Sequence, residues 1–333
     1  MKVLVTGGAG YIGSTICSAL EDRNHNPIIL DSLITGKKQF INGRIFYKGD
    51  IADKNVLERI FKKYPDIRYV VHCAALRKVP ESVERPYDYY SNNVCKSLEL
   101  FRNLNDLGCK NIIYSSSASV YESVKGFRVT ESSSVGPKSP YAKTKVMVET
   151  ILKDFCRTYG MRGISFRYFN PIGADPKMRS GSHDKEPISL LGKLVQAARK
   201  NTVFEITGNK WNTRDGTGIR DYPHVWDLAT AHVLVIERFS EVLKKAGRND
   251  GYLTINLGMG EGVTVKEFVV AFEKVLGRKI KKKFSPPRPG DVAGAYADTN
   301  LARKLIDWKA TLTLEEGILH ALEWAKKWES AKK

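Results

Sequence analysis

A tyrosine and a lysine four residues apart are the side chains of this sequence best suited to move a proton. Tyr141 and Lys145 belong to the segment Tyr-Ala-Lys-Thr-Lys, and a spacing of four places both on one face of a helix. A phenol has a pKa of about 10 and is a poor base at neutral pH. A nearby ammonium group favours the phenolate and lowers that pKa, so the pair suits general base catalysis. An exposed helical pair without catalytic function is the alternative.

Three hydroxyl side chains precede this pair. Ser115, Ser116 and Ser117 end a strand-like segment, at the sheet edge where a substrate would lie. Ser117 is predicted to share a hydrogen bond with the reacting oxygen. The Tyr-x-x-x-Lys spacing often occurs by chance, so the prediction rests on its combination with these serines and with a glycine-rich turn near residue 7.

That turn carries three glycines spaced three apart. Gly7, Gly10 and Gly13 lie between a strand-like segment and a helix-like one. Such a turn lets the backbone approach a pyrophosphate and directs a helix N-terminus at its negative charge. A tight turn without a ligand is the alternative. Asp31 ends the second strand-like segment, where a carboxylate accepts both ribose hydroxyls and repels a 2′-phosphate, so NAD is favoured over NADP.

Two more segments fit contacts with a dinucleotide. Asp50 suits the adenine amino group and Ile51 suits the face of the ring, although Asp50 could equally be a helix N-cap. The small residues Ala74 and Ala75 follow the fourth strand-like segment, where the chain must pass close to the cofactor.

Strand-like and helix-like segments alternate through the first half of the chain. The expected strands are Val3–Thr6, Pro27–Leu30, Arg44–Tyr47, Tyr69–His72, Asn111–Tyr114 and Gly163–Arg167, and the expected helices are Tyr11–Glu21, Lys54–Lys62, Ser91–Leu107 and Tyr141–Tyr159. Alternation of this kind indicates parallel β-α-β units. The sequence therefore predicts an α/β fold with a Rossmann-type doubly wound parallel sheet, and residues 1–176 as its NAD-binding domain.

The second half has shorter elements after a polar, loop-like segment, Ala174–Pro187. Helices are expected at Ile188–Lys200, Val225–Phe239, Val265–Val275 and Leu314–Trp328, and strands at Val203–Ile206 and Leu253–Leu257. We expect residues 177–333 to form a smaller α/β substrate domain, with some later segments returning to the first domain. Ligands of open α/β sheets bind beyond the carboxyl ends of the strands, which places the site between the two parts.

Composition narrows the class of protein. The chain has 54 Lys and Arg against 36 Asp and Glu, a net charge of +18, which attracts anions. Its densest basic run, Arg278–Lys283, has strand-like residues and no interleaved aromatics, so a solvated strand face is favoured over a nucleic-acid patch. No apolar run is long enough to cross a bilayer, and the first residues do not resemble a signal peptide.

The number and spacing of the cysteines also narrow the class of protein. The five cysteines form no Cys-x-x-Cys pair, which argues against a disulfide framework or a zinc site and favours reduced, buried thiols. We expect a cytoplasmic protein without bound metal, nucleic acid or membrane.

Longer motifs resemble the extended short-chain dehydrogenase/reductases, the family of NAD-dependent epimerases and dehydratases, and within it the UDP-glucose 4-epimerases. The resemblance covers nearly the whole chain. Its stretches are Thr6–Gly13, His72–Ser82 (HCAALRKVPES), Tyr89–Val94 (YYSNNV), Ser115–Tyr121 (SSSASVY), Ser139–Lys145 (SPYAKTK), Arg167–Ala174 (RYFNPIGA), Asp215–His224 (DGTGIRDYPH) and Pro287–Asp291 (PRPGD).

The resemblance implies residue roles. Tyr141 would be the base, Lys145 would set its pKa and anchor a ribose, and Ser117 would relay the proton. The implied NAD contacts are Gly7, Gly10, Tyr11, Ile12, Gly13, Asp31, Ser32, Asp50, Ile51, Ala74, Ala75, Arg77, Asn92, Tyr141, Lys145 and Phe169. The implied UDP-sugar contacts are Ser117, Tyr141, Asn170, Ser189, Leu190, Arg220, Arg288, Asp291 and Ala295.

Among the implied UDP-sugar contacts, Arg220 and Arg288 suit a diphosphate, because guanidinium groups bind phosphate oxygens bidentately. Some positions depart from the family pattern: Arg77 replaces a lysine, Ser32 replaces an asparagine, and the pair Ser189-Leu190 replaces Asn-Leu. A homodimer formed through helices of the first domain is also implied.

The residues beside Ser117 bear on the reaction. Relatives that dehydrate or decarboxylate nucleotide sugars usually carry an acid next to the strand-end hydroxyl, whereas Ala118 and Ser119 follow here and Glu122 lies beyond Tyr121. This favours reversible C4 oxidation and reduction of UDP-glucose and UDP-galactose with tightly bound NAD.

The range of sugars stays open. The small side chain of Ala295 suggests that UDP-GlcNAc and UDP-GalNAc also fit. A UDP-glucuronate or UDP-N-acetylglucosamine 4-epimerase is the nearest alternative. A non-catalytic NAD-sensing or nucleic-acid-binding protein is the alternative from another class.

Overall fold

A seven-stranded sheet forms the centre of the protein in a computed structural model that describes residues 1–287 and 292–330. The strand order is β10-β7-β5-β4-β1-β2-β3, and every pair is parallel. The strands are β1 (Lys2–Thr6), β2 (Asn26–Asp31), β3 (Ile45–Lys48), β4 (Tyr69–His72), β5 (Asn111–Ser117), β7 (Arg162–Tyr168) and β10 (Tyr252–Leu257). The predicted Rossmann-type doubly wound sheet is confirmed.

Both faces of this sheet are covered by helices. One face packs on α1 (Tyr11–Asp22), α8 (Val225–Lys245) and α10 (Asn300–Ile306), and the other on α2 (Lys54–Lys63), α5 (Lys96–Asp106) and α6 (Pro140–Tyr159). Within β1, Val3 and Val5 belong to the first core and Leu4 to the second. Burial on both faces explains why the strands are apolar throughout.

One edge strand of the central sheet, β10, comes from the second half of the chain. β10 pairs with β7 and forms the edge of the sheet on that side. Its Leu253, Ile255 and Leu257 join the same core as α8. Segments after residue 177 therefore complete the central sheet.

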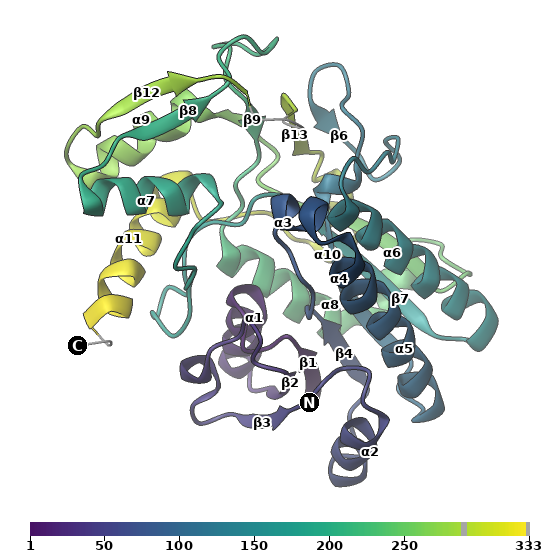
Figure 1. Ribbon diagram of the computed structural model, residues 1–333. Helices are drawn as coiled ribbons and strands as arrows, with labels where there is room; N and C mark the ends of the chain where they lie inside the picture. The colour runs from purple at the N-terminus through teal and green to yellow at the C-terminus, as the bar shows by residue number, and fades with distance from the viewer. Residues whose placement is uncertain (288–291, 331–333) are drawn as a thin grey trace.

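A second group of elements lies to one side of the sheet (Figure 1). Its α7 (Leu190–Lys200), β8 (Phe204–Thr207), α9 (Val265–Leu276) and α11 (Leu314–Ser330) share an apolar core, and β12 (Lys282–Ser285) pairs with β8. Lys282 and Lys283 are exposed on β12, as predicted for the basic run. A small sheet joins β11 (Val263–Thr264), β9 (Ile219–Arg220), β13 (Gly294–Ala297) and β6 (Arg128–Val129).

The helix predicted over Ser91–Leu107 is confirmed, except that its first turns are π-helical, and two short helices that were not predicted precede it. Two short helices, α3 (Val79–Glu84) and α4 (Pro86–Tyr89), are followed by a π-helical segment, η2 (Tyr90–Cys95), and only then by α5. Prolines in the first turns of α3 and α4 favour helix starts. The wider π turn is a common feature of functional sites and here carries Asn92 and Asn93.

All five cysteines are free thiols. Cys17, Cys109 and Cys156 are buried as predicted, whereas Cys73 is partly buried and Cys95 is exposed, so the prediction is wrong for these two. Cys73 directly follows β4, at the carboxyl ends of the parallel strands, with its Sγ 3.0 Å from Ser115 Oγ. Among the described residues, no helix combines the length and apolarity needed to cross a bilayer.

Candidate active site

The glycine-rich turn packs tightly against the segment that follows β4. Gly7 has φ +70°, and a Cβ there would lie 2.7 Å from Ala74 N. A Cβ on Gly13 would lie 2.3 Å from Gly7 O. Larger residues would therefore displace the turn, and the N-terminus of α1 is left facing the edge where strand order reverses, between β1 and β4. This geometry fits a bound pyrophosphate.

Two residues at the start of α1 connect the turn to its surroundings. The Tyr11 hydroxyl donates to Gly173 O at 2.7 Å, which links the turn to the chain after β7. Ile12 is partly buried and packs against the apolar core that α1 shares with α8 and α10. Both predicted residues thus lie at the turn.

Asp31 lies at the end of β2 as predicted, and its carboxylate is buried. One oxygen accepts from Ala9 N at 3.0 Å and the other from Leu33 N at 2.8 Å. Burial raises the pKa of Asp31, and these two backbone donors oppose that shift. Each carboxylate oxygen keeps a lone pair, so the group can still accept ribose hydroxyls. Ser32 follows it and is partly buried.

The N-cap interpretation of Asp50 is wrong. Asp53 is the residue that caps α2, because its Oδ1 accepts from Asn55 N and Val56 N. Asp50 instead accepts from Ala52 N at 3.0 Å and from Lys96 Nζ at 2.5 Å.

The rest of the predicted adenine-side set lies near the ends of β3 and β4. Ile51 is buried, and Ala74 and Ala75 are partly buried.

A buried asparagine that the sequence analysis missed holds the segment after β4. Asn93 Oδ1 accepts from Leu76 N at 2.8 Å, and its Nδ2 donates to Leu76 O at 2.9 Å. Its neighbour Asn92, a predicted contact, donates to Asn93 Oδ1 at 3.1 Å. A second polar residue inside the YYSNNV motif was the available signal. Arg77, also predicted, forms an ion pair with Asp184 at 2.5 Å.

The structure brings Ser117, Tyr141 and Lys145 together, and we refer to these three residues as the catalytic cluster. Ser117 ends β5, and α6 begins directly before Tyr141, where Ser139 Oγ accepts from Ala142 N. The Ser117 hydroxyl lies near enough to Tyr141 to lower the pKa of the phenol, and its Oγ accepts from Ser119 Oγ at 2.9 Å. Lys145 Nζ donates to Ser115 O at 2.7 Å and lies 5.7 Å from the centre of the Tyr141 ring.

Burial dominates the pKa values of the catalytic cluster. It raises the pKa of Tyr141, while the nearby Ser117 hydroxyl and the charge of Arg77 oppose the shift. It also lowers the pKa of Lys145 to about 8. The expected lowering of the phenol pKa by Lys145 is therefore absent in the protein alone, because desolvation of the phenolate outweighs the charges around it.

A buried ion pair lies next to the catalytic cluster and joins the elements that carry it. Arg167 on β7 donates to Glu149 on α6 at 2.6 Å and 3.0 Å, and Ser116 donates to the same carboxylate at 2.5 Å. These contacts tie β5, α6 and β7 together. This pair was not predicted, although an arginine within an apolar strand was an available signal. Phe169, a predicted contact directly after β7, is buried beside Tyr121.

The small sheet places Arg220 beside Ala295. The two residues are register partners on β9 and β13. Arg220 Nη1 donates to Ile219 O and Ala293 O, both at 2.7 Å, and Nη2 donates to Val292 O at 3.0 Å.

Gly294 makes this arrangement possible and was not predicted. It has φ +132°, and a Cβ there would lie 2.0 Å from Arg220 Nη1 and 1.7 Å from Ile219 O. We refer to Arg220, Gly294 and Ala295 as the arginine site.

The remaining predicted substrate residues are dispersed. Asn170 donates its backbone N–H to Asp221 O at 3.0 Å, which places it at the end of β9. Ser189 caps α7 by accepting from Gly192 N at 3.2 Å, and Leu190 packs on the core of the second group. Arg288 and Asp291 lie outside the described residues.

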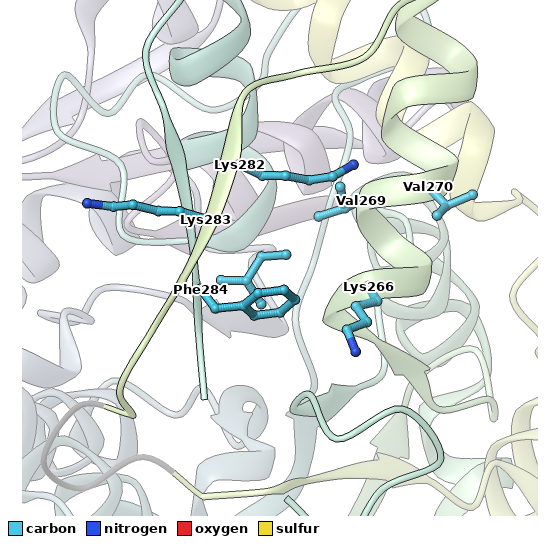
Figure 2. Close-up of a pocket in the computed structure, with 7 residues that line it drawn as sticks. Lys266, Val269, Val270, Lys282, Lys283 and Phe284 are labelled. Carbon is cyan, nitrogen blue, oxygen red and sulfur yellow. The ribbon is translucent and has the colours of Figure 1, made fainter. Parts of the chain in front are cut away.

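An apolar pocket of about 290 Å³ lies elsewhere, between β12 and α9 (Figure 2). Its lining consists of Ile206, Lys266, Val269, Val270, Lys282, Lys283 and Phe284. None of the predicted site residues lines it, so it is separate from the catalytic cluster.

Comparison with known proteins agrees with this geometry. Residues 3–258 match the model of the NAD dependent epimerase/dehydratase family, and the chain belongs to that family.

The similarity to individual members extends over nearly the full length. The chain is 38% identical to a UDP-glucose 4-epimerase of Bacillus subtilis, over 97% of this chain and 96% of that protein. It superposes with a TM-score of 0.92, at 33% identity and 99% coverage of both chains, on a UDP-glucose-4-epimerase from Stenotrophomonas maltophila with bound NAD and formylated UDP-arabinopyranose. The UDP-Glc/GlcNAc 4-epimerase of Campylobacter jejuni gives a TM-score of 0.80 at 30% identity, with 98% of this chain and 99% of that chain covered.

Proposed function

We propose that this chain is a UDP-glucose 4-epimerase, which interconverts UDP-glucose and UDP-galactose and retains NAD between turnovers. The observation that carries the proposal is the catalytic cluster, in which a partly buried tyrosine lies beside a buried lysine and near a strand-end serine whose hydroxyl favours the phenolate. Residues 118 and 119, which follow Ser117, are alanine and serine. A hydroxyl pair without an adjacent acid suits removal of a proton from oxygen rather than from carbon.

In this mechanism Tyr141 Oη takes the proton of the sugar C4 hydroxyl and later returns it. Bound NAD supplies a reversible hydride acceptor, and its positive charge opposes the effect of burial on the phenol pKa. Ser117 passes the proton between the sugar hydroxyl and Tyr141. Lys145 is held by Ser115 O, and its ammonium group stabilises the phenolate and anchors the cofactor ribose.

We assign NAD binding mainly to residues 1–176 and UDP-sugar binding mainly to residues 177–333. The glycine-rich turn, Asp31 and the segment after β4 support the first assignment. Arg220 supports the second assignment, because a guanidinium group can bind phosphate oxygens of the diphosphate bidentately. β10 and α8 belong to the second part of the chain, but β10 is the edge strand of the central sheet and α8 covers one of its faces.

A wider sugar range has one specific observation in its favour. Ala295 lies beside Arg220 and packs against the cluster that contains Phe169. A methyl side chain leaves room where a larger one would exclude an N-acetyl group. We therefore propose that UDP-GlcNAc and UDP-GalNAc are also substrates, an activity that matches the name of the similar Campylobacter jejuni enzyme.

The direct test uses the purified protein without added cofactor. NAD released on denaturation is measured, and conversion of UDP-galactose to UDP-glucose is followed alongside conversion of UDP-GlcNAc and UDP-glucuronate. We expect the protein to contain bound NAD and to convert both UDP-galactose and UDP-GlcNAc. Protein that contains and binds no NAD would contradict the proposal. Protein that binds NAD but converts no nucleotide sugar would favour a sensing role, and turnover of UDP-glucuronate alone would favour the alternative epimerase.

We further propose a cytoplasmic homodimer. Free thiols at all five cysteines support a reducing compartment. α5 and α6 expose Leu98, Met147 and Tyr159, and a hollow runs between the same helices beside Leu98 and Phe155. Light scattering should give twice the monomer mass. Met147→Glu should give the monomer mass, whereas Leu319→Glu, an equally exposed change on α11, should not.

A further inference from the structure

The DGTGIRDYPH motif contains Asp221, a fully buried aspartate directly after Arg220. Its Oδ1 accepts from Met259 N at 2.7 Å, and its Oδ2 accepts from Gly260 N and Ala297 N, both at 3.1 Å. Met259 and Gly260 follow β10, and Ala297 ends β13. One carboxylate therefore ties two distant segments to the end of β9.

The residues assigned to the UDP-sugar lie around this aspartate. Asp221 O accepts from Asn170 N at 3.0 Å. Arg220 precedes Asp221, and Ala295 lies two positions before Ala297 on β13. Each of these three predicted substrate residues is thus at most two positions from Asp221 or from a group bonded to it.

On β13 the carboxylate takes the place of a strand partner. Tyr296 N and Asp298 N donate to carbonyl groups of β6 and of the residue before it, and successive N–H groups of a strand point to opposite sides. Ala297 N therefore faces the side of β9, which ends at Arg220. Because a buried N–H without an acceptor destabilises a protein, Asp221 completes the pairing that β9 is too short to provide.

Gly258 packs against the same carboxylate. A Cβ there would lie 2.4 Å from Asp221 Oδ2 and 2.7 Å from Ala297 Cβ. In so closely packed a region, a change in the hydrogen bonds of the carboxylate must move the backbone that donates them.

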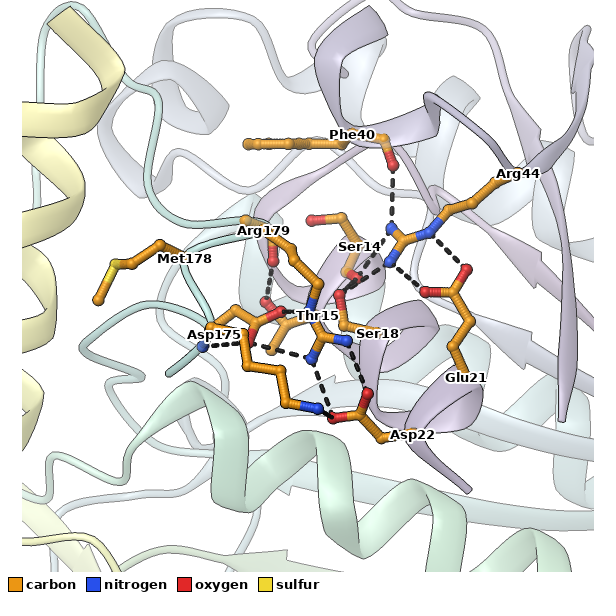
Figure 3. A network of polar contacts seen from close by, with 12 residues as sticks. Ser14, Thr15, Ser18, Glu21, Asp22, Phe40, Arg44, Asp175, Met178 and Arg179 are labelled. Carbon is orange, nitrogen blue, oxygen red and sulfur yellow. Dashed lines mark hydrogen bonds and ion pairs between the residues drawn. The ribbon is translucent and has the colours of Figure 1, made fainter. Parts of the chain in front are cut away.

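Asp175, another fully buried aspartate, is held in a different way. Arg179 Nε donates to its carboxylate at 2.6 Å, and the same guanidinium group donates to Asp22 on α1 at 2.7 Å (Figure 3). Asp175 thus has a cation as its partner, whereas the three bonds of Asp221 come from neutral N–H groups. Burial raises the pKa of Asp221 to about 6, a shift that these bonds oppose and the charge of Glu261 increases.

We propose that Asp221 is a positioning residue for the UDP-sugar, whose carboxylate fixes β13 and the segment after β10 relative to β9 and so holds Ala295 and Arg220 where they meet the substrate. The inference rests on the proposed function, since it concerns the substrate of that site. Asp221 acts through these neighbours, so its loss should weaken substrate binding and leave the chemical step at the catalytic cluster intact.

The main test is Asp221→Asn, which keeps the size of the side chain but turns one acceptor into a donor that faces an N–H group. KM for UDP-galactose should rise about tenfold, the effect of one lost buried hydrogen bond to a charged group. kcat and NAD content should stay near wild type. Titration calorimetry of the holoenzyme with UDP makes the same comparison without turnover.

Asp227 offers a matched control for loss of a buried carboxylate. It is also buried and accepts from Thr311 N at 3.1 Å and Leu312 N at 3.0 Å, in the segment between α10 and α11, which carries none of the predicted substrate residues. Asp227→Asn should lower the thermal midpoint and leave KM near wild type. Thermal midpoints of both variants separate loss of stability from loss of positioning.

A second test needs no variant. As pH falls from 7 to 5, the Asp221 carboxyl becomes protonated, and a protonated oxygen donates where it had accepted. At pH 5 about nine-tenths of a group with a pKa of 6 is protonated, so KM of the wild type should rise about fivefold if that form binds tenfold more weakly. The amide of Asp221→Asn does not titrate, so its KM should lack this rise.

Charged and titratable groups from several elements surround Asp221. Arg220 and Tyr222 flank it in sequence, Glu261 lies on the segment after β10, and Asp298, just past β13, pairs with Arg128 at 2.9 Å. Because these groups are the same in both proteins, the difference between the two pH profiles reports on Asp221.

Equal KM values for wild type and folded Asp221→Asn would overturn the proposal, as would a fall in kcat with KM unchanged or an equal rise in KM in Asp227→Asn. If Asp221→Asn does not fold, the wild-type profile decides, and a KM that stays constant from pH 7 to 5 would overturn the proposal. Wild-type holoenzyme that neither binds UDP nor converts UDP-galactose would instead contradict the proposed function.

Discussion

The catalytic cluster and the arginine site are built in opposite ways. Tyr141 and Lys145 come from adjacent turns of one helix, and Ser117 ends a strand packed against that helix. Arg220 is held by carbonyl groups of Val292 and Ala293, more than seventy positions away in sequence. The first site is defined mainly by local spacing and the second by long-range packing, so they should respond differently to substitution.

The largest effect is expected at the centre of the catalytic cluster. Tyr141→Phe removes the group that exchanges the proton, so kcat should fall about 10²- to 10⁴-fold, with NAD content close to wild type. Steady-state kinetics and cofactor release on denaturation provide both values. Tyr159→Phe, at the exposed end of the same helix, should have no comparable effect. Activity retained by Tyr141→Phe would break the assignment of the base.

Lys145→Met should lower kcat about 100-fold, because the phenolate loses a neighbouring cation and the cofactor loses an anchor. Weaker retention of NAD should accompany the loss. Lys143→Met changes an exposed lysine in the same turn and should behave like wild type. Full activity of Lys145→Met would leave the phenol without its proposed partner.

The pKa of Lys145 also predicts how stability depends on pH. Burial lowers it to about 8, from 10.5 as the ordinary value. Between these pH values the unfolded chain binds more protons at this residue than the folded one, so folding stability increases as pH rises. Urea unfolding of cofactor-free protein should show the wild type gaining stability relative to Lys145→Met from pH 8 to 10.5. A constant difference across this range would contradict the burial effect.

At the arginine site the expected effect is smaller and falls on substrate binding. Gly294→Ala places a Cβ against Arg220 Nη1, so KM for UDP-galactose should rise about 10- to 100-fold, as for loss of a charge-assisted contact, while NAD content is unchanged. Gly218→Ala is the matched control, because a Cβ there would lie 3.4 Å from its nearest neighbour, an ordinary contact. A fall in kcat with KM unchanged would show that the two sites are not separable.

The smallest change concerns sugar choice. Ala295→Tyr should lower kcat/KM for UDP-GlcNAc about tenfold relative to UDP-glucose, because it fills the space proposed for the N-acetyl group. Ala295→Ser should leave the ratio near wild type. An unchanged ratio in the tyrosine variant would place the N-acetyl group elsewhere.

Much of the fold was predictable from local pattern. Strand boundaries in the central sheet agree with the apolar segments to within a few residues, because strands buried on both faces must be apolar throughout. The helix over Ser91–Leu107 was predictable in this way, but the two short helices before it and the π turn at its start were not. The π turn carries Asn93, which holds Leu76 in the segment after β4, a contact between positions 17 apart in sequence.

The sequence by itself determined the chemistry at the carboxyl edge of the sheet: a glycine-rich turn, a carboxylate at the end of β2, and Tyr141 and Lys145 on one helical face. Helix and strand periodicity fix such spacings wherever the elements lie.

Tertiary structure alone decided the rest. It placed β10 in the central sheet, Ala295 beside Arg220 under the constraint of Gly294, and Asp221 against Ala297. It also reversed the expected shift of the Tyr141 pKa. These outcomes depend on burial and on contacts between distant segments, and neither is encoded in the spacing of neighbouring residues.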